Sequence, residues 1–154
     1  MVKTIRAVAP NDIGQVQAFI ERVGLEEISP SSGATLLLME EAMAYEDQGE
    51  TAPIAVIGIV ETHDHAILRH MIVDSKRCKA EDILQLLMAA IKQAKAMEVK
   101  GLYFLTKAAA EMFQPLGFSV IQPIELPDAL QNDPWFAIHE EEIPAIKLLA
   151  HVFH

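Results

Sequence analysis

The pattern of apolar and polar positions predicts a chain that begins with a strand and a helix. Lys3–Val8 alternates polar and apolar side chains, the period of a half-buried strand. After Pro10, apolar residues recur at three- and four-residue spacing, which is typical of an amphipathic helix. The helix residues in question are Ile13, Val16, Phe19, Ile20 and Val23. Gly24 is expected to end this helix.

Three strands are expected next, one after another. They are Thr35–Glu40, Ile54–Thr62 and Ala66–Val73, rich in Leu, Ile and Val. The polar segment Tyr45–Thr51 joins the first two, and the turn His63-Asp64-His65 joins the last two. Strands in direct series favour antiparallel pairing.

The second half of the chain predicts helices that alternate with strands. An apolar stripe runs along a helix from Ile83 to Ala94. It is followed by a strand at Gly101–Leu105, a short helix at Lys107–Leu116 and strands at Phe118–Ile121 and Ala145–Phe153. Strand–helix–strand units predict parallel pairing with right-handed crossovers. The fold class is therefore α/β (α+β), with a mixed, mostly antiparallel central sheet flanked by helices.

Composition describes a single globular domain over residues 1–154, with 51% hydrophobic and 22% charged residues. The longest apolar run, Ala52–Val60, has the length of a strand and is too short to cross a membrane. One cysteine, Cys78, excludes an internal disulfide. The N-terminal residues lack the features of a signal peptide, so a cytoplasmic protein is expected.

The charge of the chain argues against a nucleic-acid partner. Its formal net charge is −10, whereas nucleic-acid binding draws most of its affinity from neutralising phosphates. We interpret the acidic clusters as solvated loops and helix ends. These clusters are Glu26–Glu27, Glu40–Glu41, Glu46–Asp47 and Glu140–Glu142.

Leu68–Ile91 combines a buried strand, a loop and a helix, a common framework for binding phosphate. The loop, Ser75–Asp82, contains no glycine and ends in Glu81 and Asp82. Two interpretations are open. Carboxylates in the first helical turn stabilise a helix dipole by roughly 0.3–1 kcal/mol each, so the helix supplies its own anion. Alternatively, basic side chains of the loop meet the phosphates; these are Lys76, Arg77 and Lys79.

The order of elements and three local patterns resemble the GNAT N-acetyltransferases. Ile67–Asp74 resembles the central strand of that family, and Ile83–Lys95 resembles its cofactor-side helix. Leu102–Phe118 resembles its closing unit, in which a short helix is followed by Leu-Gly-Phe. The tail Ile121–Ala129 extends the likeness towards bacterial members that acetylate amino acids or confer arsenic resistance.

The resemblance implies acetyl-CoA as the co-substrate. The main chain of Met71, Ile72 and Val73 would then pair with the pantetheine arm. In the family, a loop of the type Arg/Gln-x-x-Gly-x-Gly/Ala holds the pyrophosphate through its N–H groups. This chain has a degenerate version of that loop, with Cys78, Lys79, Glu81 and Ile83 at the matching positions.

The resemblance also suggests catalytic roles. Glu61 ends the strand before the central one, where the family often carries a general base; an exposed strand-end carboxylate is the alternative. His70 is a second candidate base, and Arg69 a candidate for binding the carboxylate of an acceptor. Phe113 stands where many members have a tyrosine general acid.

His63 and His65 flank Asp64 in the predicted turn, and we expect them to be solvated. No third ligand is evident for a metal site formed by these two histidines.

Three functions are therefore considered. The first is an acyl-CoA-dependent N-acetyltransferase that acts on a small primary amine, such as an amino acid or an amino-acid-like compound. The second is a catalytically inactive GNAT-fold module that binds a metabolite or a protein. The third is an oligomer subunit, with a homodimer as the simplest case, that uses the apolar segment Ile143–Phe153.

Overall fold

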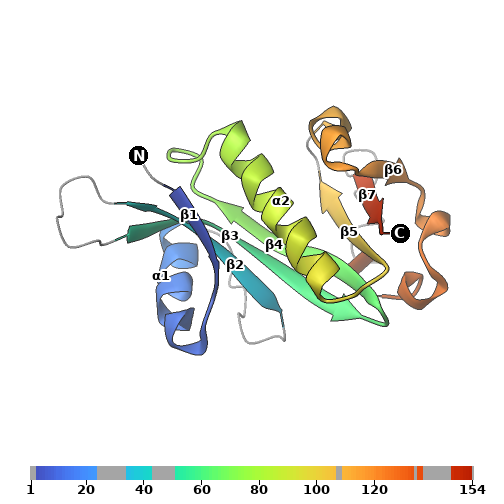
Figure 1. Ribbon diagram of the computed structural model, residues 1–154, viewed down its shortest axis with the longest axis horizontal. Coiled ribbons are helices and arrows are strands. Elements are labelled where there is room, and N and C mark those ends of the chain that lie inside the picture. Colours follow the sequence, from blue (N-terminus) through green and yellow to red (C-terminus); the bar gives the residue numbers. More distant parts are fainter. Residues whose placement is uncertain are drawn as a thin grey trace. The chain divides into compact units, whose positions relative to one another are not determined.

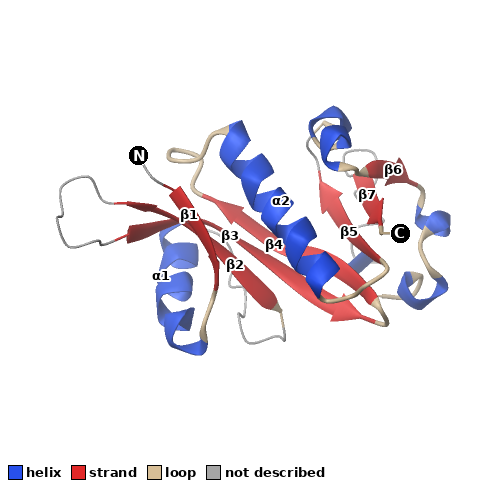
Figure 2. Cartoon of the chain, viewed as in Figure 1, coloured by secondary structure: helices blue, strands red, loops and turns tan. Residues whose placement is uncertain are grey.

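The computed structural model describes residues 3–23, 34–42, 51–106, 109–133, 135–136 and 147–153. Figure 2 draws these residues in colour. The chain divides into two compact units. Unit 1 comprises Met1–Val60 and Arg69–Ala90, and unit 2 comprises Glu61–Leu68 and Ile91–His154. The predictions for residues 24–33 and 43–50 lie outside the described residues.

Unit 1 contains the N-terminal strands and helix in the predicted order (Figure 1). A short 3₁₀ turn, Pro10–Asp12, precedes the first helix. The long elements are β1 (Lys3–Ala7), α1 (Ile13–Val23), β2 (Thr35–Ala42), β3 (Thr51–Thr62), β4 (His65–Val73) and α2 (Ala80–Ala96). The last three are shared with unit 2, which contains the end of β3, the start of β4 and the end of α2. β2 pairs antiparallel with β3, as the serial strands predicted. β1, which precedes α1, pairs antiparallel with the other edge of β2.

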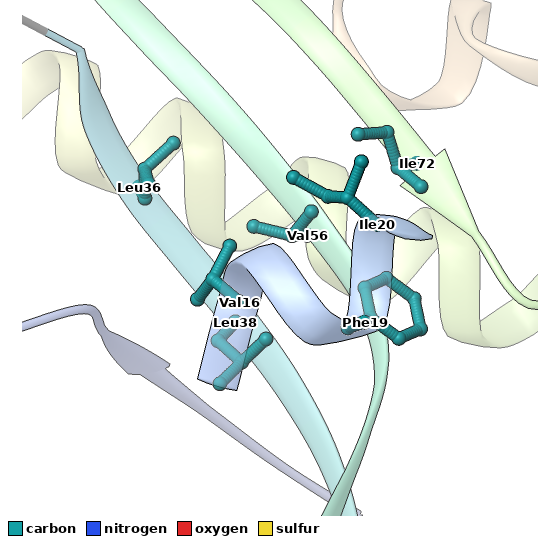
Figure 3. Close-up of a cluster of buried hydrophobic side chains, with 7 residues drawn as sticks. All are labelled: Val16, Phe19, Ile20, Leu36, Leu38, Val56 and Ile72. Atoms are coloured by element: carbon teal, nitrogen blue, oxygen red, sulfur yellow. The ribbon is translucent and has the colours of Figure 1, made fainter. Parts of the chain in front are cut away.

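The apolar stripe of α1 forms the core of unit 1 together with the strands. Figure 3 shows α1 lying over the strands, with α2 on their other side. Val16, Phe19 and Ile20 are each at most 2% exposed. They pack against Leu36, Leu38, Val56 and Ile72. The helical period read from the sequence therefore corresponds to this buried face.

Unit 2 contains the start of β4, the end of α2, and β5 (Gly101–Thr106), β6 (Ser119–Ile121) and β7 (Lys147–Val152). β4 pairs parallel with β5 through Ala66↔Leu102 and Ile67↔Tyr103, as expected for a strand–helix–strand unit. The predicted final strand is present as β7. The mixed, mostly antiparallel α/β class is confirmed.

The expected pairing of the strands on either side of residues 107–118 was wrong. β7 lies between β5 and β6 and pairs antiparallel with both. Its register with β5 runs from Gly101↔Val152 to Thr106↔Lys147, whereas β6 pairs only over Ser119–Ile121. The long partner of β5 therefore comes from the C-terminal segment.

The short helix predicted at Lys107–Leu116 is replaced, in its described part, by two 3₁₀ turns. These turns are Ala110–Met112 and Gln114–Leu116. Pro115 lies in the second turn; it has no N–H and its ring obstructs a continuous α-helix. Gly117 then ends the segment with a left-handed φ of 99°.

Two predictions of solvated polar residues were also wrong. Glu40 and Glu41 lie in β2 and are 4% and 8% exposed. Glu40 accepts hydrogen bonds from Arg6 Nε at 2.5 Å and Thr51 Oγ1 at 2.7 Å. The long-range partner Arg6 thus makes burial of this carboxylate possible.

His65 is the second of these corrections. The turn between β3 and β4 needs only His63 and Asp64, which have φ values of 48° and 66°. His65 therefore already belongs to β4, where it is 8% exposed and its ring meets Tyr103 edge-on at 5.8 Å.

None of the described helices is long and apolar enough to cross a membrane.

Acidification should destabilise unit 2 through buried His65 and half-buried His151. Burial lowers the pKa of His65, with the charge of Lys100 adding to the effect, and burial with Lys95 lowers the pKa of His151. The unfolded chain then binds protons first as the pH falls through about 6.5, so stability is lost below that pH. We expect a lower urea midpoint at pH 5.5 than at 7.5, with a smaller fall in His65→Gln. The exposed turn variant His63→Gln is the control; a pH-independent midpoint contradicts the prediction.

Gly117→Ala should destabilise the fold by about 1–3 kcal/mol. A Cβ there would lie 2.8–2.9 Å from two imidazole atoms of His151, and φ is already left-handed. Gly14→Ala is the matched control, because a Cβ on Gly14 in α1 meets nothing within 4 Å. That change should stabilise by about 0.5–1 kcal/mol. Urea denaturation measures both, and equal effects of the two variants would refute the account of Gly117.

Candidate active site

The second half of β4 carries the main-chain groups predicted to contact a pantetheine arm. Ile72 is 2% exposed and packs against α1, whereas Met71 and Val73 are half-buried. The register with β5 covers Ala66 and Ile67, while β4 itself continues to Val73. Only main-chain atoms of residues 71–73 enter the predicted role, so the apolar side chains are compatible with it.

Asp74 organises the loop that follows β4. Its N–H donates to Ile54 O at 2.9 Å, which ties the end of β4 to β3. Its Oδ1 accepts from Lys76 N at 3.1 Å, and its carbonyl oxygen accepts from the N–H groups of Arg77 and Cys78 at 3.0 Å. Three successive loop N–H groups therefore bond to one aspartate.

The side chain of Asp74 is held in place by α1. Arg22 Nη1 donates to its Oδ2 at 3.0 Å, and Arg22 Nη2 donates to Pro53 O at 3.1 Å. Burial works to raise the pKa of Asp74, but the hydrogen bonds from Arg22 and Lys76 outweigh it, so this pKa is lowered. The carboxylate stays ionised at neutral pH.

Asp82 occupies the first turn of α2 and closes the other end of the loop. Its Oδ2 accepts from the N–H of Lys79 at 2.8 Å, which is half of a capping box. The same oxygen accepts from Lys3 Nζ of β1 at 2.6 Å. Burial works to raise the pKa of Asp82, but these two hydrogen bonds and the charge of Lys3 lower it overall. Asp82 is 4% exposed, while its neighbour Glu81 is exposed.

The basic side chains of the loop remain at the surface. Lys76, Arg77 and Lys79 are all exposed. Arg77 also lines a hollow of about 310 Å³ in unit 1, together with Arg22 and Pro53. Cations that could meet an anion are therefore present as side chains, whereas the neighbouring N–H groups are engaged.

Cys78 is poorly suited to act as a nucleophile. Its Sγ lies 3.3 Å from Ile54 O, to which the thiol donates. Burial, with the negative charge of Asp82, raises the pKa of the thiol to about 11. A thiol is nucleophilic as the thiolate, so this residue packs rather than reacts.

Several solved acetyltransferases and CoA-bound structures resemble this chain. N-acetylglutamate synthase from Neisseria gonorrhoeae, complexed with coenzyme A and N-acetylglutamate, matches with a TM-score of 0.69 and 17% identity over 100% of this chain and 36% of that one. Rv2747 from Mycobacterium tuberculosis, in complex with CoA, matches with a TM-score of 0.70 and 13% identity over 98% and 99% of the two chains. A GNAT-family acetyltransferase from Staphylococcus aureus matches with a TM-score of 0.63 and 14% identity over 99% and 100%.

This chain has the GNAT N-acetyltransferase fold. The expectation drawn from Ile67–Asp74 and Leu102–Phe118 is thereby confirmed. The chain spans about a third of the length of the N-acetylglutamate synthase chain. No sequence-family model matches it, and no curated protein matches it in sequence.

The other residues predicted for a GNAT active site are placed as follows. Glu61 lies near the end of β3 in unit 2 and is exposed. Arg69 is half-buried in β4 of unit 1, and the side chain of His70 lies outside the described part of the chain. Phe113, for which the resemblance predicted a tyrosine, is 1% exposed and packs edge-on against Phe104 at 5.2 Å between ring centroids.

Sequence reasoning missed Lys3 and Arg22, the partners of Asp82 and Asp74. Both come from elements far along the chain, 79 and 52 residues away respectively. No local pattern marks them. They are found only once β1 and α1 are packed beside the loop.

Cys78 should react slowly with iodoacetamide in the folded protein. At pH 8 a thiol with a pKa near 11 has roughly a hundredfold less thiolate than one near 9, and burial slows attack further. The same protein in 6 M guanidinium is the control and should react at the rate of a free cysteine. Equal rates in the two conditions, followed by mass spectrometry, would show that the thiol is neither buried nor perturbed.

Proposed function

We propose that this protein is an N-acetyltransferase that transfers an acetyl group from the pantetheine thioester of acetyl-CoA to a small primary amine, such as an amino acid or an amino-acid-like compound. One observation carries the proposal: the chain matches GNAT acetyltransferases along nearly its whole length, including structures that hold CoA. The N-acetylglutamate synthase match is the basis for favouring an amino-acid acceptor.

The donor would lie along the main chain of Met71, Ile72 and Val73. These residues form the C-terminal part of β4, whereas Ala66 and Ile67 near its start pair with β5. A strand whose N–H and C=O groups are available can pair with the amide groups of a pantetheine arm, as in strand addition by a peptide. Any contact with the donor phosphates would come from exposed side chains of the loop, namely Lys76, Arg77 and Lys79.

The reaction needs one base and a proton for the leaving group. The neutral amine attacks the thioester carbonyl, the C–N bond forms and the C–S bond breaks. We assign Glu61, exposed near the end of β3, to take the proton of the ammonium group through water, with His70 as the alternative base. Arg69 would bind a carboxylate of the acceptor. Phe113 cannot donate a proton, so the thiolate would take its proton from solvent.

A second function, a GNAT-fold binding module without activity, is favoured by two of the same observations. The loop N–H groups of residues 76–79 are engaged by Asp74 and Asp82. Phe113 replaces the usual proton donor. Under this alternative the protein would bind a metabolite or a protein without releasing free thiol.

Thiol release from acetyl-CoA distinguishes the two functions. We expect release with a panel of amino acids and related amines. Glu61→Gln should lower kcat/KM by about a hundredfold or more, the usual contribution of a general base. Glu98→Gln, an exposed carboxylate after α2, is the matched control and should keep full activity. Absence of both thiol release and acetyl-CoA binding at millimolar ligand would exclude the acetyltransferase.

A further inference from the structure

Six main-chain N–H groups of the loop after β4 and the start of α2 donate to acceptors within the protein. The N–H groups of Lys76, Arg77 and Cys78 donate to Asp74, and that of Lys79 donates to Asp82. The N–H groups of Asp82 and Ile83 donate to Lys79 O at 3.0 and 3.2 Å. Main-chain N–H groups that bind a phosphate in such loops must point at the ligand and be free to donate. Here, the six named groups already have acceptors.

The carboxylate of Asp82 takes the place that an anion would occupy at this helix end. It is 4% exposed, bonds to the N–H of the residue before α2, and is neutralised by Lys3 at 2.6 Å. A phosphate approaching the same N–H group would have to displace this carboxylate and would meet its negative charge. Like charges at this range repel, and a buried ion deprived of its partner is costly.

With Asp82 at this helix end, we expect the main contacts to a donor to be with its uncharged part. The main chain of Met71–Val73 offers amide partners for pantetheine. The exposed side chains of Lys76, Arg77 and Lys79 offer only screened, solvated charges to phosphates. The protein would therefore bind the pantetheine end of CoA more specifically than its nucleotide end.

We propose that the acyl donor of this protein is recognised as a pantetheine thioester, that the nucleotide phosphates are dispensable, and that Asp82 is the residue that sets this specificity. This inference rests on the proposed function. It narrows the donor class to acylated pantetheine, whether free, 4′-phosphorylated or part of CoA.

Three donors test the proposal on the whole protein: acetyl-CoA, S-acetyl-4′-phosphopantetheine and S-acetylpantetheine. Their Kd values are measured by titration calorimetry in 0.5 M NaCl, where the exposed loop cations are screened. We expect the three values to agree within tenfold. A preference of more than tenfold for acetyl-CoA overturns the inference and leaves the proposed function standing. Absence of binding by all three donors overturns both.

Two variants test whether the charge of Asp82 is what weakens binding of the nucleotide phosphates. Asp82→Asn keeps an oxygen that can cap the N–H of Lys79 but removes the charge, so acetyl-CoA should bind roughly fivefold tighter at 0.15 M salt, with S-acetylpantetheine unchanged. Glu81→Gln removes the same charge from the adjacent exposed position and is the matched control. It should change the acetyl-CoA Kd by less than twofold. Equal effects of the two variants would overturn the role of Asp82.

Discussion

Hydrogen-bond satisfaction of the N–H groups between β4 and α2 is the constraint on which unit 1 depends most. Without glycine in the loop, two aspartates of the chain supply the acceptors. Each aspartate is in turn neutralised from another element: Asp74 by Arg22 of α1, and Asp82 by Lys3 of β1. The loop, the first strand and the first helix are therefore linked through charged pairs. A buried carboxylate needs such a partner, so these contacts depend on one another.

The same contacts limit how the site can work. A helix N-terminus with free N–H groups binds anions, and that of α2 is already supplied with one. A chain with a net charge of −10 adds no general attraction for phosphates. Under the donor specificity proposed above, recognition would fall to uncharged contacts along β4.

Position 113 contributes to packing without contributing a catalytic group. Phe113 keeps the aromatic packing of the closing unit, edge-on against Phe104, which also meets Phe118 at 4.9 Å. It lacks the tyrosine hydroxyl that the resemblance to GNAT enzymes predicts at this position. The hydrophobic role of the position is sufficient to build the fold, and the catalytic role is not needed for it.

Local periodicity by itself determined the main elements: α1, α2, the serial strands and the parallel pairing of β4 with β5. Each element forms because apolar residues a few positions apart in the sequence fall on the same face of a helix or strand. Tertiary structure alone decided that β7 would pair with β5, that Glu40 and His65 would be buried, and that Lys3 would hold Asp82. Each of these depends on a partner distant in the sequence, as with the 79 residues between Lys3 and Asp82. The charged loop could therefore be read from the sequence, but whether its charges were free or already paired was settled only by packing.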